Sequence, residues 1–157
     1  MALSFIFRND KEKLIEQLGY YGIKKLPYLL TRSGKEKIRG YSGNLSTDEI
    51  IKINQEVSIE LLGIYLFHDY HGDMRLSFDA IYALKDQITE NVITLDDKQA
   101  EEYLKGRDIN LTKEDKEKWK TESKGFKIIK HKDEFIGTGK LIEDRIVNYM
   151  PKERRLR

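Results

Sequence analysis

Apolar and polar residues alternate with changing periods along the first part of the chain. In residues 9–18 the apolar side chains recur at the spacing of one helical face, and Gly19 follows them, which predicts a helix and its end. Residues 26–32 and 37–42 are rich in strand-forming side chains and are separated by a Ser-Gly-Lys-Glu turn. This arrangement predicts a β-hairpin.

Helix and strand signals continue up to residue 89. Ser46 is followed three residues later by Glu49, the pattern of a capping box, and apolar residues come directly after it. Residues 57–67 form a long run of strand-forming side chains, and residues 74–78 return after a turn that contains glycine. We therefore expect residues 1–89 to form a small α/β unit with a mostly antiparallel sheet.

The second part of the chain predicts short strands around one helix. Residues 90–95 indicate a linking strand, and residues 96–106 indicate a helix that an aspartate caps and a glycine ends. Residues 107–111 predict another strand, whereas the polar stretch 112–125 predicts a loop, with a helical turn within it as an alternative. Residues 126–150 contain three short apolar runs separated by turns, and this spacing predicts a small β-barrel.

Composition excludes several classes of protein. Hydrophobic residues make up 39% and charged residues 36% of the 157 residues, which suits a folded domain with a highly charged surface. No cysteine is present, so disulfides, thiolate metal sites and cysteine nucleophiles are excluded for these residues. No apolar run approaches the roughly 20 residues of a membrane span, and the first residues read as a strand. We expect a cytoplasmic location.

Charge is unevenly distributed along the sequence. Residues 116–157 contain 13 Lys and Arg against 7 Asp and Glu, a balance of +6, although the net charge of the whole chain is only +2. A basic C-terminal part favours a polyanionic partner, and a solvated charged surface is the alternative.

The stretch FIGTGKL, residues 135–141, resembles the end of a nucleotide-binding P-loop but fails its requirements. The first glycine of that motif would fall at Glu134, and the residue after Lys140 is Leu141 instead of Ser or Thr. The stretch also lies within a series of strands, whereas a P-loop joins a strand to a helix. We conclude that the two glycines shape a barrel strand, and no nucleotide cofactor is expected.

Two segments together resemble a known family. They are AEEYLKGRDI at 100–109 and GFKIIKHKDEFIGTGKLIEDRIVNYMPKERR at 125–155, and they are similar to the RNA-binding end of the Sun-type RNA cytosine-C5 methyltransferases. The residues that carry the similarity are Leu104, Lys105, Gly106, Gly125, Phe126, Gly137, Gly139, Lys140, Asn148, Pro151, Lys152 and Arg155. Val147, Glu153 and Arg154 depart from the family pattern.

The resemblance implies an α+β chain of two domains. Residues 1–89 would form a pre-PUA-like α/β domain, and residues 90–157 a PUA-like β pseudo-barrel, a plan also found in ribosome-biogenesis factors. The family's catalysis requires a cofactor-binding domain and a cysteine, and neither is found in this sequence. The resemblance therefore implies a non-catalytic protein, not an enzyme, that binds rRNA or tRNA during RNA modification or ribosome biogenesis.

The expected RNA-binding residues lie mainly at the C-terminus, because Lys and Arg neutralise phosphates. Tyr149 is able to stack on an exposed base, and Asn148 to bond a base, a ribose hydroxyl or the local backbone. The complete expected set is Lys105, Arg107, Lys140, Arg145, Asn148, Tyr149, Lys152, Arg154, Arg155 and Arg157.

Two other functions compete with RNA binding. His68, His71 and Asp73 lie near a predicted hairpin turn and would serve a metal-dependent hydrolase if the turn brought them together. Residues three apart on a strand point to opposite faces, which disfavours such a site. The other alternative is a protein-binding adaptor or a subunit that acts with a separate RNA methyltransferase.

Overall fold

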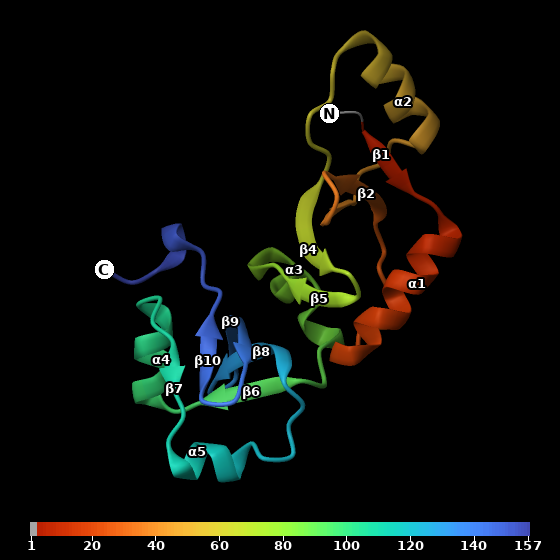
Figure 1. Ribbon diagram of the computed structural model, residues 1–157. Coiled ribbons are helices and arrows are strands. Elements are labelled where there is room, and N and C mark those ends of the chain that lie inside the picture. The colour runs from red at the N-terminus through yellow and green to blue at the C-terminus, as the bar shows by residue number, and fades with distance from the viewer. Residues whose placement is uncertain (1–2) are drawn as a thin grey trace.

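The computed structural model describes residues 3–157, and they fold around two five-stranded sheets (Figure 1). The first sheet has its strands in chain order, and every neighbouring pair is antiparallel. Its strands are β1 (Ser4–Ile6), β2 (Leu29–Ser33), β3 (Lys37–Tyr41), β4 (Ile64–Tyr70) and β5 (Asp73–Leu76). The mostly antiparallel N-terminal sheet that the sequence predicted is therefore confirmed.

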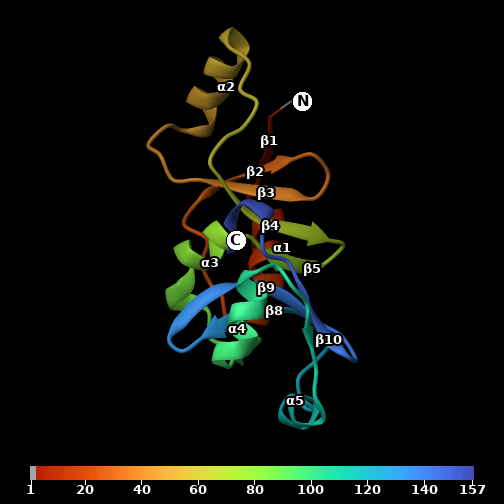
Figure 2. The ribbon, with the colours of Figure 1, turned by 90° about the vertical axis from the view of Figure 1, so that its left-hand side faces the viewer.

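Helices flank the first sheet. They are α1 (Arg8–Leu18), which continues into the 3-10 turn η1 (Gly19–Tyr21), α2 (Thr47–Glu56), and α3 (Phe78–Ala83) with η2 (Lys85–Gln87). The predicted capping box at the start of α2 is present, because Ser46 accepts from the Glu49 amide while Glu49 accepts from the Ser46 amide. Helix α2 lies at the end of the molecule far from the C-terminal sheet, as two perpendicular views show (Figure 2).

The second sheet has the order β6-β8-β9-β10-β7 and curls into a partial barrel. Its strands are β6 (Val92–Leu95), β7 (Ile109–Asn110), β8 (Gly125–His131), β9 (Glu134–Leu141) and β10 (Arg145–Asn148). Strand β6 runs parallel to β8, and the other pairs are antiparallel. Helix α4 (Asp97–Leu104) begins at a capping box between Asp96 and Gln99, and η3 (Lys152–Arg154) follows the last strand.

Glycines in β9 allow close approach of neighbouring groups, as the FIGTGKL pattern predicted. Gly137 has φ +154°, and a Cβ atom at this position would lie 2.2 Å from the Tyr103 hydroxyl. A Cβ at Gly139 would lie 2.7 Å from Cγ2 of Ile146 on the neighbouring strand β10. Tyr103 uses the space to donate a hydrogen bond of 2.8 Å to the Thr138 carbonyl oxygen, which joins α4 to the sheet.

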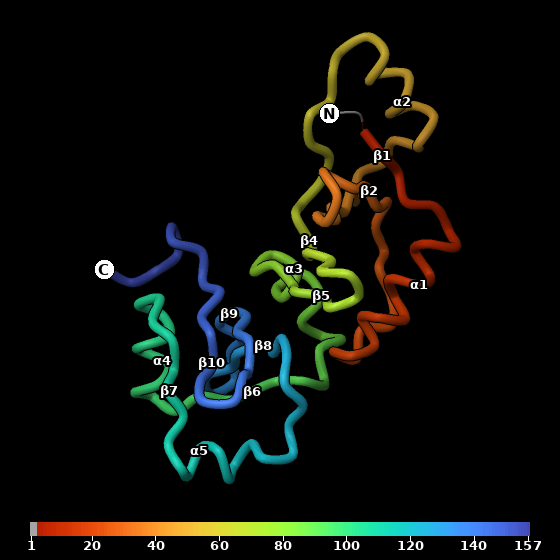
Figure 3. Tube along the Cα trace, viewed as in Figure 1, coloured from red at the N-terminus to blue at the C-terminus, as the bar shows by residue number. Residues whose placement is uncertain are grey.

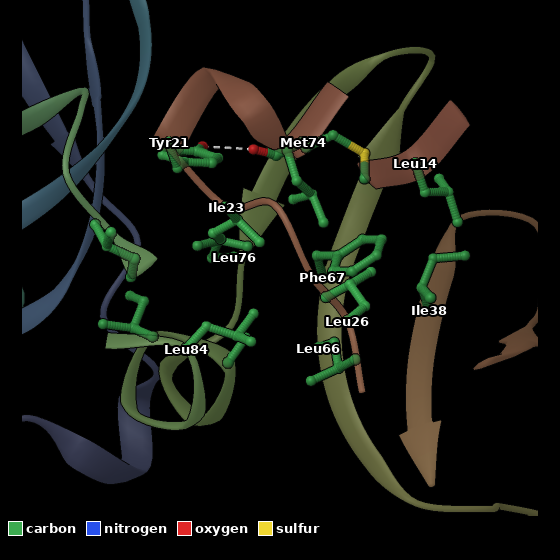
Figure 4. Packing of buried hydrophobic residues seen from close by; sticks show 14 of the residues in the cluster. Leu14, Tyr21, Ile23, Leu26, Ile38, Leu66, Phe67, Met74, Leu76 and Leu84 are labelled. Atoms are coloured by element: carbon green, nitrogen blue, oxygen red, sulfur yellow. Dashed lines mark hydrogen bonds between the residues drawn. The ribbon is translucent and has the colours of Figure 1, made fainter. Parts of the chain in front are cut away.

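A hydrophobic core lies between the first sheet and α1. Tyr21, Leu66, Phe67 and Leu76 are buried in it, and the Tyr21 hydroxyl donates to the Met74 carbonyl oxygen (Figure 4). Phe126 and Ile128, which belong to the second sheet, are part of the same cluster. The two sheets therefore share one core, and a second cluster packs between the curled sheet and α4.

The buried ammonium of Lys127 joins segments that are distant in the sequence. Its side chain is fully buried, and Nζ donates to the Tyr20 hydroxyl at 3.0 Å, to Asn91 Oδ1 at 2.6 Å and to Ser123 Oγ at 3.1 Å. Glu122 supplies a carboxylate oxygen at 3.7 Å. All three hydrogens of the ammonium thus have partners, as burial of a charge requires.

One local prediction needs correction, and in another the structure favours the helical alternative. Residues 57–63 precede β4 as irregular chain, because Gly63 has φ +77° and packs against the Gly40 carbonyl, so the strand begins only at Ile64. The predicted loop 112–125 contains α5 (Lys113–Lys118), which Thr112 caps together with Asp115. In the described part of the chain, 3–157, no helix combines the length and the apolar character needed to cross a bilayer.

Replacement of Lys127 by Met is expected to destabilise the protein by about 2 kcal/mol or more, since each hydrogen bond to a charged group contributes roughly 1.5–3 kcal/mol. The polar atoms of Asn91 and Ser123 would lose their partner. Chemical denaturation measures the change, and the exposed Lys124→Met serves as the matched control. Equal stability of the Lys127→Met variant and the parent would contradict the role of this ammonium.

Gly137→Ala is expected to lower stability by about 1–3 kcal/mol, because alanine would be strained at this backbone angle and would collide with Tyr103. Gly19→Ala is the opposite case, since Gly19 has φ −55° and open space around it. We expect that variant to match or exceed the parent in thermal unfolding. A Gly137→Ala protein with an unchanged unfolding temperature would refute the argument.

Candidate nucleic-acid interface

The C-terminal segment is packed against the end of α4. Pro151 precedes η3, and the Leu156 amide donates to the Leu104 carbonyl oxygen at 2.8 Å. The Arg155 side chain lies against Gly106, where a Cβ would come within 2.4 Å of it, and Arg155 Nε donates to the Met150 carbonyl oxygen at 3.1 Å. The trace in Figure 3 shows the segment passing beside α4. Packing and hydrogen bonds thus hold the basic segment in place.

The basic side chains of this segment differ in their surroundings. Arg154 pairs with Asp79 at 3.1 Å, and its guanidinium lies 4.3 Å from the centre of the Phe78 ring. Lys152 and Arg157 are exposed, and within residues 3–157 neither has a carboxylate oxygen within 4 Å. These two cations are therefore available to a polyanion.

Three further cations of the expected set are neutralised by nearby carboxylates. Lys105 Nζ lies 2.6 Å from Glu101, and Arg107 contacts Glu102 at 2.8 Å. Arg145 Nε lies 3.6 Å from Asp108. The contact with Arg107 lowers the pKa of the Glu102 carboxyl and keeps it ionised. A phosphate would have to displace these carboxylates before it could bind the three cations.

The surroundings of these pairs are also acidic. A cavity of about 510 Å³ lies between α4, β7 and α5 and is lined by the carboxylates Asp96, Glu102, Asp108, Glu114 and Asp115, with Lys98 as its one basic residue. Negative potential there opposes the approach of a phosphate backbone. This face is a poorer location for a polyanion than the C-terminal segment.

Asn148 is held by the local backbone. Its amide group donates to the carbonyl oxygens of Tyr103 at 2.7 Å and Arg107 at 2.8 Å, and its Oδ1 accepts from the Met150 amide at 2.7 Å. Both amide hydrogens are thus used within the protein. Among the roles considered for Asn148, these contacts favour the backbone contact, which fixes α4 against the end of β10.

Lys140, the lysine of FIGTGKL, lies where the two sheets meet. Its Nζ is 3.9 Å from Asp73 Oδ2 on β5 and 5.0 Å from the centre of the Phe126 ring on β8. The side chain is therefore placed between the sheets. Lys140 lies within strand β9, whereas the lysine of a phosphate-binding loop lies at the start of a helix.

An aromatic row continues from Lys140 across the same junction. His68 and Tyr70 on β4 stack at 3.9 Å, Tyr70 lies 5.7 Å from Phe126, and Phe126 packs edge-to-face on Tyr149 at 5.2 Å. Residues from both sheets contribute to the row. Stacked and edge-to-face pairs at these separations are favourable.

Arg75 on β5 is a residue that sequence reasoning missed. Its guanidinium lies 5.8 Å from the Tyr70 ring centre and 4.9 Å from that of Tyr149. Its Nε is buried without a hydrogen-bond partner, and no carboxylate in the described residues pairs with it. The signal in the sequence was weak, because Arg75 alternates with buried Met74 and Leu76 as any outward strand residue does.

A pocket of about 210 Å³ opens beside Arg75 at the junction of the two sheets, and we call it the junction pocket. Its wall combines residues of β4, β5, α3, β9 and η3. Those with aromatic or ionisable side chains are Tyr65, Arg75, Phe78, Asp79, Tyr103, Tyr149, Glu153 and Arg154. The expected residues Tyr149 and Arg154 thus lie together here, apart from Lys105, Arg107 and Arg145, which lie beside acidic residues.

The histidines near the β4–β5 turn do not form a metal site. His68 Nε2 lies 2.7 Å from a carboxylate oxygen of Glu36, and His71 occupies the turn with φ +56°. Residues 3–157 contain no group of three or more metal-binding side chains placed to hold an ion. The arrangement gives the hydrolase alternative no support.

Comparisons with known proteins find a family match for the C-terminal part of the chain. Residues 90–156 match the family model of the methyltransferase RsmF PUA domain. The ribosomal RNA small subunit methyltransferase F of Shewanella halifaxensis (strain HAW-EB4) is 24% identical over 153 residues, which are 98% of this chain and 30% of that protein. The protein of the same name from Psychromonas ingrahamii (strain DSM 17664 / CCUG 51855 / 37) is 27% identical over 116 residues.

The relatives are much longer than this chain. The Psychromonas match covers 69% of this chain and 22% of the relative, and the Aeromonas salmonicida (strain A449) protein of the same name is 25% identical over 65% of this chain and 20% of its own length. The chain thus spans at most about a third of these proteins. Residues 90–156 are shown to resemble the PUA region of RNA methyltransferases, as the motifs of the sequence predicted.

Proposed function

We propose that these 157 residues bind RNA and carry out no methyl transfer themselves. The observation that carries the proposal is the match of residues 90–156 to a PUA domain, together with a packed C-terminal segment that presents Lys152 and Arg157 to solvent. Phosphate neutralisation by exposed cations is the main source of affinity for nucleic acids. The sequence holds no cysteine for attack on a cytosine ring.

The RNA that we propose is ribosomal RNA. The similar proteins are named as methyltransferases of the small-subunit ribosomal RNA, and their similarity extends over 98% of this chain in one case. We further propose that residues 1–89 act as a pre-PUA-like domain that supports the PUA-like domain of residues 90–157. Contacts across the shared core support such a pairing.

A protein-binding adaptor is the second candidate, and the surface of α2 favours it. Ile51, Ile53, Val57 and Leu61 are exposed on α2 and the segment that follows, and Val57 and Leu61 are each 60% exposed. Large apolar side chains that remain exposed to water are candidates for a contact with another protein. Under this alternative a separate RNA methyltransferase would be the partner, and the chain alone would bind RNA weakly.

The double variant Lys152→Ala, Arg157→Ala is expected to bind single-stranded RNA more weakly than the parent, with a salt dependence that is flatter by about 0.7 in slope for each phosphate that is no longer neutralised. Within residues 3–157 these two side chains have no carboxylate partners, so their removal leaves the packing of Arg155 and the Arg154–Asp79 pair intact. Fluorescence anisotropy titrations at several salt concentrations measure both effects.

The charge-matched control is Lys35→Ala, Lys52→Ala, which removes two exposed lysines from the first sheet's turn and from α2. We expect this control to bind RNA as the parent does. If both double variants lose affinity equally, binding follows net charge alone and the C-terminal segment is not the site. If the parent itself shows no salt-dependent affinity for RNA, the adaptor alternative is favoured.

A further inference from the structure

We infer that the junction pocket receives one unstacked base of a bound RNA. This inference rests on the proposed function, because it assigns a place for part of the same ligand. The pocket is formed by both sheets, and it adjoins η3, whose first residue is the exposed Lys152. A strand whose phosphates contact the C-terminal segment would therefore pass directly beside the pocket.

Arg75 has an unused hydrogen-bond donor next to aromatic rings. Arginine side chains inside proteins usually have their hydrogen-bond donors satisfied, yet Nε of Arg75 has no partner, and no carboxylate among residues 3–157 neutralises the guanidinium. Aromatic rings of Tyr70 and Tyr149 lie beside it. Guanidinium planes and aromatic rings are the groups on which proteins stack bases that have left a helix.

Polar groups at the wall would select a base over an apolar ligand. The Tyr65 hydroxyl lies beside the Arg75 guanidinium, and burial raises the pKa of Tyr65, so this hydroxyl stays protonated and able to donate. The Tyr103 hydroxyl is already bonded to the Thr138 carbonyl oxygen. The pocket wall therefore carries a polar hydroxyl from Tyr65 as well as the aromatic rings of Phe78 and Tyr149.

Size and charge fit a single base. The volume of about 210 Å³ is below the roughly 300–1,000 Å³ of pockets that hold drug-sized ligands, so one ring system would fill it. Of the two carboxylates in the wall, Asp79 is already paired with Arg154. The positive charge of Arg75 balances the second carboxylate, Glu153, so the wall carries no excess negative charge.

Three hairpin RNAs test the inference: one fully paired, one with a single bulged nucleotide, and one with an abasic sugar at the bulge. We expect the parent to bind the bulged hairpin about tenfold more tightly than either of the others, since stacking of one base on an aromatic side chain contributes at about this level. The Arg75→Lys variant keeps the positive charge but removes the planar guanidinium, and we expect it to bind the bulged and abasic hairpins with equal affinity. Arg32→Lys on β2 is the matched control and should keep the preference.

The outcomes separate the inference from the proposed function. Equal affinity of the parent for the bulged and paired hairpins overturns the inference and leaves RNA binding standing. Equal affinity for the bulged and abasic hairpins overturns it as well, because the base would then contribute nothing. Failure to bind both the hairpins and the single-stranded RNA refutes the proposed function. If the Arg75→Lys variant does not fold, Tyr149→Leu replaces it in the test. This variant removes the aromatic face and keeps an apolar contact with Phe126, and it should also lose the preference for the bulged hairpin.

Discussion

The burial of one lysine fixes how the two sheets of this protein sit together. The ammonium of Lys127 is out of contact with water and is stable there because Tyr20, Asn91 and Ser123 each accept one of its hydrogens. Tyr20 belongs to the turn after α1, and Lys127 belongs to β8. A shift of one sheet against the other would remove the Tyr20 hydroxyl from a buried charge, which costs more than the same shift between apolar surfaces.

A fixed junction makes a composite site possible. Arg75 comes from the first sheet and Tyr149 from the end of the second, yet the guanidinium and the ring lie 4.9 Å apart. The Thr138 hydroxyl strengthens the same contact by donating to the Leu76 carbonyl oxygen at 3.0 Å, next to Arg75 in the sequence. Neither half of the chain could form the junction pocket alone, because residues of both sheets line it.

Local features of the sequence predicted much of the fold, because their causes lie within a few residues. The capping box at Ser46 and the aspartate cap of the helix that starts at Asp97 act over such distances. The junction could not be predicted in this way. Lys127 and Tyr20 are 107 residues apart, and Lys127 reads as one more charged residue of a basic region. Arg75 was missed for the same reason, since its isolation from carboxylates arises only in the folded chain.

Several of the basic residues that indicated a polyanionic partner are paired with carboxylates in the folded chain. Of the expected cations, Lys105, Arg107, Lys140, Arg145 and Arg154 each have a carboxylate oxygen within 4 Å. Ion pairs at an exposed surface contribute little to stability, so they are exchangeable, but a phosphate must compete for each of them. Lys152 and Arg157, which are free of such pairs in the described part of the chain, are held in position by the packing of Arg155 on Gly106. The backbone that carries these two cations is therefore fixed by the fold, next to a pocket that is lined by aromatic side chains.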